Sequence, residues 1–185
     1  MARLPLPADP GSPELATALA EIKATRGFVS NALHTLGHAP GGLLHFARVG
    51  EYVKYKTDLP EKLRELTILT SARGVDYAWK HHQPLAVQAG IDAGAVREIG
   101  EGKVPPGLPA NEQAIVAFVM ALGSLTVTDP IMDAMKQHYS SRQIVDVALS
   151  ATYYGALGRM VVALGVDLDD EPTLKVERDW QKGRT

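Results

Sequence analysis

Residues 65–91 constrain the fold more than any other part of the chain. A helical run, residues 66–72, contains no charge and follows a single carboxylate, Glu65. A break at Arg73-Gly74 separates it from a second helical run that carries two aromatic residues and two histidines within six positions. Titratable and aromatic groups crowd together in this way nowhere else in the sequence. We therefore expect two adjoining helices here, and we expect any polar pocket of the protein in the same stretch.

Glu65 requires a partner wherever it lies, because it shares its helix face with Ile68 and Leu69. A carboxylate on an apolar face must be paired, hydrogen-bonded or protonated. Three interpretations stay open. Glu65 forms a salt bridge with a structural arginine such as Arg64 or Arg73, or it transfers a proton with a pKa raised by burial. In the third interpretation it orients a histidine by accepting a hydrogen bond from the ring.

The second run distributes its aromatic and histidine side chains over two helix faces. Trp79 and His82 share one face, whereas Tyr77 and His81 fall on a neighbouring face. We select His82 for the pocket, with Trp79 as its apolar wall, and expect His81 at the surface or behind the pocket. The alternative for His82 is a partly buried histidine with a satisfied hydrogen bond. Pro84 moves the expected helix start toward His81 and exposes N–H groups there that an anion can use.

The remaining sequence predicts an all-α fold, a single-domain helical bundle of about eight or nine helices, because no run alternates with period two as a strand does. Residues 1–11 are expected to form an irregular arm and residues 166–185 a polar tail. The segments near 112–125 and 144–164 are apolar on most faces, which predicts burial and self-association. The expected helices are 13–25, 28–36, 40–53, 60–72, 76–89, 93–99, 112–122, 130–138 and 142–164.

Composition excludes several classes of function. The chain has 185 residues, a length that suits one domain, and its net charge of −2 argues against nucleic-acid binding and against attraction to anionic membranes. The absence of cysteine excludes disulfides, thiolate metal sites and thiol mechanisms, and it is typical of a cytoplasmic protein. Asp146 and Arg159 interrupt the longest apolar segment, 143–164, so no membrane span is expected.

No metal and no cofactor is expected. Adjacent histidines on a helix point apart, and neither H-x-x-x-H nor H-E-x-x-H occurs. Tyr153 and Tyr154 are interpreted as core residues, although the Tyr154 hydroxyl can reach the pocket. The other histidines are scattered and are interpreted as surface or packing residues; they are His34, His38, His45 and His138.

A pattern over residues 64–91 resembles the carboxymuconolactone decarboxylase family. The chain reads Arg-Glu-Leu at 64–66, Tyr-x-Trp-x-x-His at 77–82 and Ala-Gly-Ile at 89–91. The core of the resemblance covers residues 60–95, and a weaker resemblance extends over most of the chain. The resemblance implies the helical fold that this family shares with alkylhydroperoxidase D-like proteins, and association as a trimer or hexamer.

Two departures from the family pattern affect what the resemblance implies. The peroxidase branch carries a Cys-x-x-Cys pair, and aligning its histidine on His82 puts the cysteine positions at Val75 and Ala78, which excludes a thiol peroxidase. The segment between Glu65 and Tyr77 is also about two residues shorter than the usual spacing in the family that the chain resembles. A two-residue shift rotates a helix by about 200°, which leaves open whether Glu65 and His82 meet.

The resemblance implies a cofactor-free lyase, a decarboxylase acting on a small unsaturated carboxylic acid or lactone. His82 is then the catalytic acid/base and Glu65 its catalytic partner, either ionised beside the substrate carboxylate or protonated as a donor. The alternative is a non-catalytic small-molecule-binding or structural oligomer of the same fold. The residues expected to bind the substrate are Trp79, Tyr77, His81 and Tyr154.

Overall fold

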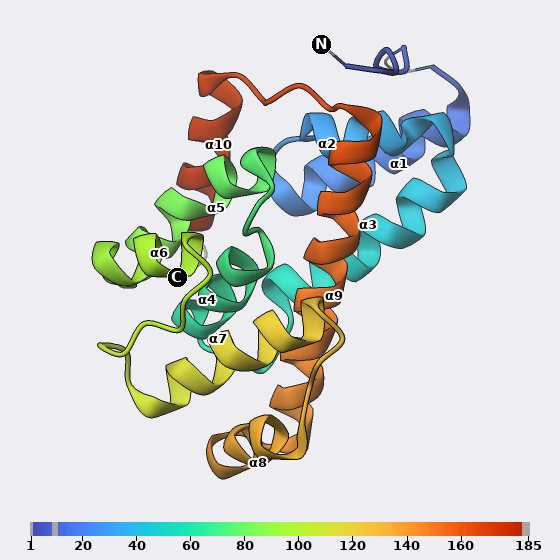
Figure 1. Ribbon diagram of the computed structural model, residues 1–185. Coiled ribbons are helices and arrows are strands. Elements are labelled where there is room, and N and C mark those ends of the chain that lie inside the picture. The colour runs from blue at the N-terminus through green and yellow to red at the C-terminus, as the bar shows by residue number, and fades with distance from the viewer. Residues whose placement is uncertain (1, 9–10, 183–185) are drawn as a thin grey trace. The chain divides into compact units, whose positions relative to one another are not determined.

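The structure of the protein is a computed structural model that describes residues 2–8 and 11–182. All regular elements in these residues are helices, as Figure 1 shows, and the predicted all-α class is confirmed. The described residues form ten α-helices and one 3₁₀ helix, η1, in place of the eight or nine helices expected. The elements are α1 (Pro13–Arg26), α2 (Asn31–Thr35), η1 (Leu36–His38), α3 (Pro40–Tyr55), α4 (Glu61–Ser71), α5 (Asp76–Gln88), α6 (Ala93–Gly100), α7 (Ala110–Gly123), α8 (Asp129–His138), α9 (Ser141–Leu164) and α10 (Glu171–Lys182).

The additional helix, α10, lies in the segment that the sequence analysis treated as a polar tail. The Asp170 carboxylate accepts a hydrogen bond from the Thr173 N–H at 2.9 Å, and Pro172 follows Asp170 in the first turn. Half of the residues of α10 are charged, yet its apolar and charged side chains separate onto different faces at helical spacing, so the sequence does contain a helical pattern here. The polar tail of the prediction thus contains a helix over residues 171–182 that was not predicted. Residues 2–8 are irregular, as predicted, whereas residues 9–10 of the arm and 183–185 of the tail lie outside the described residues.

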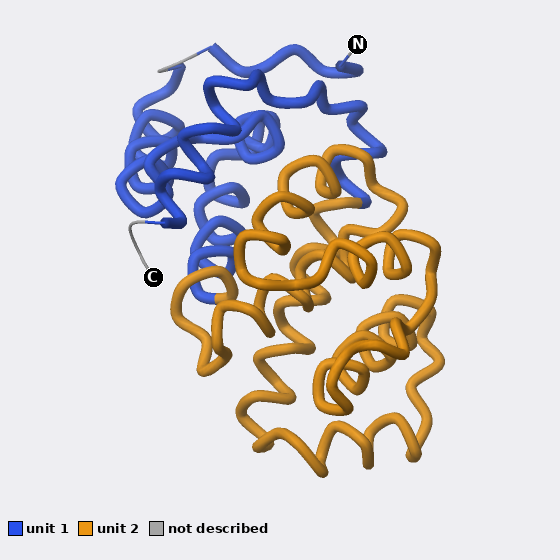
Figure 2. Tube along the Cα trace, turned by 90° about the vertical axis from the view of Figure 1, so that its left-hand side faces the viewer, with its two compact units in different colours: residues 1–52, 159–185 blue, residues 53–158 orange. Residues whose placement is uncertain are grey.

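The chain divides into two compact units, coloured separately in Figure 2. Residues 1–52 and 159–185 form unit 1, and residues 53–158 form unit 2. Both boundaries fall inside helices, so α3 and α9 each continue from one unit into the other. The motif that carries the family resemblance lies entirely within unit 2, and the single-domain assignment of the chain stays a prediction.

Unit 1 has its own apolar core, contributed by α1, α2 and α3. Gly27 ends α1 with a positive φ of 79°, and a Cβ added there would lie 2.5 Å from the ring of Trp180 in α10. Only glycine permits this close approach. The Asn31 N–H donates a hydrogen bond to the Asp169 carboxylate at 2.9 Å, which secures the segment before α10. The buried members of the core are Leu15, Ala18, Leu19, Ile22, Leu33, Leu43 and Ala47.

Unit 2 is built around α4, whose side chains are buried at seven of its eleven positions. Helices α5, α6 and α7 contact α4. The apolar character predicted for α7 corresponds to burial inside this unit, where Ile115 and Val116 are fully buried beside Leu66 and Leu69 of α4. This packing fixes the backbone on both sides of Glu65, the one charged residue among the buried positions of α4.

Helix α9 is long and largely apolar, but it contains a buried aspartate. Its 24 residues are long and apolar enough to cross a membrane by length and composition alone, although core helices of soluble proteins pass the same test. The Asp146 side chain is 1% exposed, and its carboxylate accepts a hydrogen bond from the Asp58 N–H at 2.9 Å. Within unit 2, α9 therefore contributes a buried polar contact as well as apolar packing.

Two helices of unit 2 end in the same hydrogen-bonding motif with different residues. After α5, Gly90 has a φ of 91° and the Ile91 N–H donates to the Ala86 carbonyl. After α7, the Thr126 N–H donates to the Ala121 carbonyl in the same way, but the left-handed position is occupied by Leu125 with a φ of 58°. The Leu125 side chain is 90% exposed, so packing does not offset the backbone strain.

We predict that Leu125→Gly stabilises the protein by about 0.5–1 kcal/mol, because glycine removes the left-handed strain at the cost of some unfolded-state entropy. The change in the free energy of unfolding would be measured by chemical denaturation. The matched variant is Gly90→Ala, where a Cβ meets no atom within 4 Å, so that only backbone strain is introduced. That variant is expected to destabilise the protein by about 1 kcal/mol. A destabilising Leu125→Gly would contradict the strain at this position.

Candidate functional site

Glu65 lies at the centre of a buried charged cluster in unit 2. It projects from α4 with no solvent exposure, and its Oε1 lies 2.6 Å from the Nζ of Lys54. Lys54 comes from the last turn of α3 and is only 2% exposed. The prediction that Glu65 has a structural cation as its partner is correct in kind, but the partner is a lysine and not Arg64 or Arg73. Two opposite charges are thus buried together, as desolvation requires.

His82 contacts the second oxygen of the same carboxylate. Its Nδ1 lies 3.4 Å from Glu65 Oε2, within hydrogen-bonding distance, and the imidazole is 6% exposed. The structure therefore brings Glu65 and His82 together, which the sequence left open. With the Nδ1 proton directed at Glu65, Nε2 is the ring nitrogen that can exchange a proton with another group.

The carboxyl group of Glu65 is ionised in this setting. Burial by itself raises the pKa of Glu65, but the Lys54 ammonium and the hydrogen bond and charge of His82 outweigh burial and lower the pKa to about 2. Of the three interpretations left open for Glu65, the one with a pKa raised by burial is therefore wrong, because Lys54 and His82 outweigh burial. Since the folded pKa lies below the reference value of 4.5, ionised Glu65 stabilises the fold above that pH, and this contribution is lost as the pH falls toward 2.

Tyr154 of α9 completes the immediate surroundings of His82. The two rings meet edge to face with centroids 5.0 Å apart and an interplanar angle of 86°. Tyr153 packs against Tyr154 in a similar way, with centroids 5.2 Å apart, and both tyrosines are buried. The structure thus places Tyr154 beside His82, although the two residues belong to helices far apart in the sequence, α9 and α5.

Tyr77 and His81 form a separate pair on α5. Their rings stack with centroids 4.7 Å apart and an interplanar angle of 27°. Of the two positions expected for His81, the surface position is wrong, because the residue is 6% exposed, and the position behind the pocket stays a prediction. The helical wheel placed these two residues on one face correctly, but it could not show that this face is covered.

Helix α5 begins at Asp76, and Pro84 lies in its interior. The prediction that Pro84 moves the helix start toward His81 was wrong. A proline inside a helix removes the hydrogen bond to the carbonyl four residues earlier, which is the carbonyl of Lys80 here. Lys80 is an exposed residue, so water can reach this part of the helix. The backbone N–H groups of the two histidines consequently lie inside the helix, where they are not an anion site.

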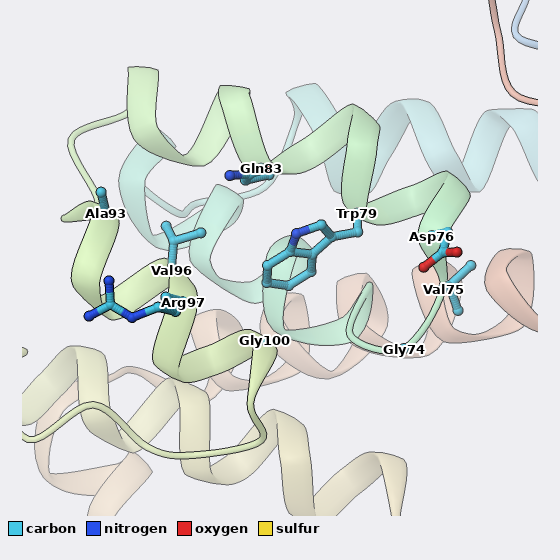
Figure 3. Close-up of a pocket in the computed structure, with 9 residues that line it drawn as sticks. All are labelled: Gly74, Val75, Asp76, Trp79, Gln83, Ala93, Val96, Arg97 and Gly100. Carbon is cyan, nitrogen blue, oxygen red and sulfur yellow. The ribbon is translucent and has the colours of Figure 1, made fainter.

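Trp79 faces a different part of unit 2 from His82. It lines a pocket of about 470 Å³ between the start of α5 and helix α6, shown in Figure 3. The predicted site residues Glu65, His82 and Tyr154 are not among the residues that line this pocket. The nine lining residues are Gly74, Val75, Asp76, Trp79, Gln83, Ala93, Val96, Arg97 and Gly100. Trp79 and His82 were predicted to share a helix face and a pocket, but His82 does not line the pocket that Trp79 lines.

Lys54 was not predicted as a partner of Glu65, although the sequence contains a signal for its burial. Leu43, Ala47 and Gly50 of α3 are buried at spacings of four and three residues, and Lys54 continues that line four residues later. A lysine that follows an apolar stripe indicates a buried cation in need of a carboxylate. Among residues 2–8 and 11–182, no group of three or more histidine, cysteine, aspartate or glutamate side chains could hold a metal ion.

We predict that Lys54→Met destabilises the fold by about 3–5 kcal/mol, because it leaves the buried Glu65 carboxylate without its cation. The double variant Lys54→Met with Glu65→Gln removes both charges and should recover much of this loss, which chemical denaturation would measure as a coupling energy. Lys103→Met is the matched control, since it breaks an exposed ion pair with Glu101 and should change stability little. Equal losses in the Lys54 and Lys103 variants would contradict a special role for the buried pair.

Solved structures of low sequence identity share this fold. An uncharacterised peroxidase-related protein from Ralstonia eutropha JMP134, an alkylhydroperoxidase AhpD core, is similar with a TM-score of 0.76 and 19% identity over 95% of this chain and 96% of that chain. A peroxidase-related protein from Silicibacter sp. TM1040 has the same TM-score and identity over 92% and 93% of the two chains. The debrominase Bmp8 in complex with 2,3,4-tribromopyrrole has a TM-score of 0.69 and 18% identity over 94% and 92%.

No protein-family model matches the chain, and no curated protein matches it. Identities of 18–19% establish the arrangement of helices and not the activity. The fold that the sequence resemblance implied is nevertheless present over more than nine-tenths of the chain. This protein has the alkylhydroperoxidase D-like fold.

Proposed function

We propose that the protein is a cofactor-free lyase that acts on a small unsaturated carboxylic acid or lactone, with His82 as its acid/base and Glu65 as the partner of His82. One observation carries the proposal: the distance of 3.4 Å between Glu65 Oε2 and His82 Nδ1 inside a buried cluster. A carboxylate that accepts from one ring nitrogen fixes the orientation of the imidazole and favours its protonated form.

Lys54 defines the role of Glu65 in this proposal. With Oε1 held by the ammonium and a pKa of about 2, Glu65 serves as a permanent negative charge and not as a proton donor. Of the two roles that the sequence left open for Glu65, the ionised one is therefore the one we propose. Its charge stabilises the imidazolium of His82, which is then the proton donor to the substrate.

The proposed reaction balances without a redox partner. The bond between the substrate carboxylate and the adjacent ring carbon breaks, CO₂ leaves, and the electron pair delocalises onto the conjugated lactone carbonyl. The imidazolium of His82 then protonates the carbanion carbon, and the neutral imidazole takes up a proton from water. A thiol peroxidase mechanism is excluded for these 185 residues because they contain no cysteine.

We predict that His82→Ala lowers turnover of 4-carboxymuconolactone by at least about 100-fold, because the general acid is lost. An ultraviolet assay of substrate loss would measure the rates, and circular dichroism would establish that the variant is folded. His45→Ala is the matched control, since His45 is an exposed histidine of α3 in unit 1. Full activity of the His82 variant would end the proposed role, and no turnover by the folded wild-type protein would overturn the decarboxylase proposal for this substrate.

We further propose that the protein self-associates as a trimer or hexamer through α9. Support comes from Val145 and Leu149, which are 55% and 42% exposed and lie four residues apart on one helix face. The double variant Val145→Lys with Leu149→Lys should shift the mass measured by light scattering to that of the monomer. Val87→Lys, at an exposed valine of α5, is the matched control and should leave the mass unchanged. A monomeric wild-type protein would overturn this proposal.

A further inference from the structure

The pocket beside Trp79 has the dimensions of a small-molecule site. Its volume of about 470 Å³ falls within the range of roughly 300–1,000 Å³ that ligand pockets occupy. Its walls are the first turns of α5, the length of α6, and Gly74 and Val75 in the connection before α5. All of its lining residues belong to unit 2, so one compact unit builds the whole pocket.

Trp79 provides a fixed aromatic surface in this pocket. A Cβ added to Gly100 would lie 3.1 Å from Cζ2 of Trp79, so the indole rests directly against the backbone of α6. The side chain also packs against the apolar core of unit 2. Trp79 nevertheless remains partly exposed and lines the pocket, so it offers aromatic surface to a flat ligand without needing to reorganise.

The pocket also contains polar side chains whose hydrogen-bonding groups are not used by the protein. Within the described residues, Arg97 makes no ion pair within 4.0 Å, although its charge helps to lower the pKa of Glu101, and neither Arg97 nor Gln83 donates a side-chain hydrogen bond. The guanidinium presents a planar set of donors that matches a carboxylate in shape and charge. An anionic group is therefore the natural ligand for the Arg97 end of the pocket.

Asp76 gives the other end of the pocket the opposite charge. Figure 3 shows Asp76 and Arg97 on opposite sides of the Trp79 indole. A carboxylate at Asp76 repels a second negative charge on the ligand and accepts hydrogen bonds from a neutral donor. The two ends together favour a ligand with one negative charge and a hydrogen-bond donor at its far end.

We propose that this pocket binds a flat aromatic monocarboxylate that carries an amino or hydroxyl group opposite its carboxylate. The ring lies against Trp79, the carboxylate pairs with Arg97, and the amino or hydroxyl group donates to Asp76. The site does not include His82 or Glu65, so its occupancy is independent of the lyase chemistry proposed above.

Isothermal titration calorimetry with 4-aminobenzoate as the probe tests this proposal. Saturable binding to wild-type protein is expected, with an affinity about tenfold higher than that of the neutral isostere 4-aminobenzamide, because only the carboxylate forms a charge-assisted pair. Arg97→Gln should weaken 4-aminobenzoate binding by about tenfold and leave 4-aminobenzamide binding unchanged. Arg142→Gln, at an exposed arginine of α9 that does not line the pocket, is the matched control and should bind like wild type.

Three results would overturn the proposal. They are the absence of saturable binding up to about 10 mM probe, equal affinities for the acid and the amide, and wild-type affinity in the Arg97 variant. His82→Ala separates this site from the proposed acid–base centre. It should retain wild-type affinity for 4-aminobenzoate, and loss of binding in that variant alone would place the probe at the Glu65–His82 pair and overturn the assignment to this pocket.

Discussion

The buried ion pair between Lys54 and Glu65 is the interaction on which unit 2 depends. Moving two charges out of water costs several kcal/mol for each ion, roughly, and only close mutual pairing with further hydrogen bonds offsets that cost. The contact of 2.6 Å supplies the pairing, and His82 contacts the second carboxylate oxygen. The end of α3, the middle of α4 and the second turn of α5 are therefore tied to a single carboxylate. An alternative packing that separated them would leave a charge buried without a partner.

The same contact determines the chemistry that Glu65 can perform. A buried glutamate without a cation would hold its proton and act as an acid. With Lys54 in place, Glu65 is a fixed anion, and His82, whose imidazole contacts it, is the group of the cluster that we propose as the proton donor. Other proteins of this fold include peroxidase-related members and a debrominase. This chain contains no cysteine, so any activity must arise from groups other than thiols.

The features of the fold and the site that could be predicted from the sequence are those that depend on residues close together in the chain. The break at Gly74, the burial of Glu65 and the helical class could all be predicted, because periodicity and glycine placement act over a few residues. The partner of Glu65 could not be identified with certainty, because the choice between an arginine and Lys54 depends on how helices pack. The burial of His81 depends on neighbouring elements for the same reason. Helix α10 was not predicted, although its residues follow an amphipathic helical pattern, because the segment was interpreted from its polar composition alone.

Two neighbouring side chains of helix α5 lie in different environments. His82 faces the charged cluster on α4, whereas Trp79 faces α6 and the pocket that contains Arg97. Residues that share no contacts usually contribute to stability independently. Exposed side chains of α6 such as Arg97 can therefore vary, and with them what the pocket recognises, without a change in the ion pair that holds α4 in place. Such modularity makes unit 2 an evolvable scaffold, in which selection on recognition and selection on the buried charges act on separate residues.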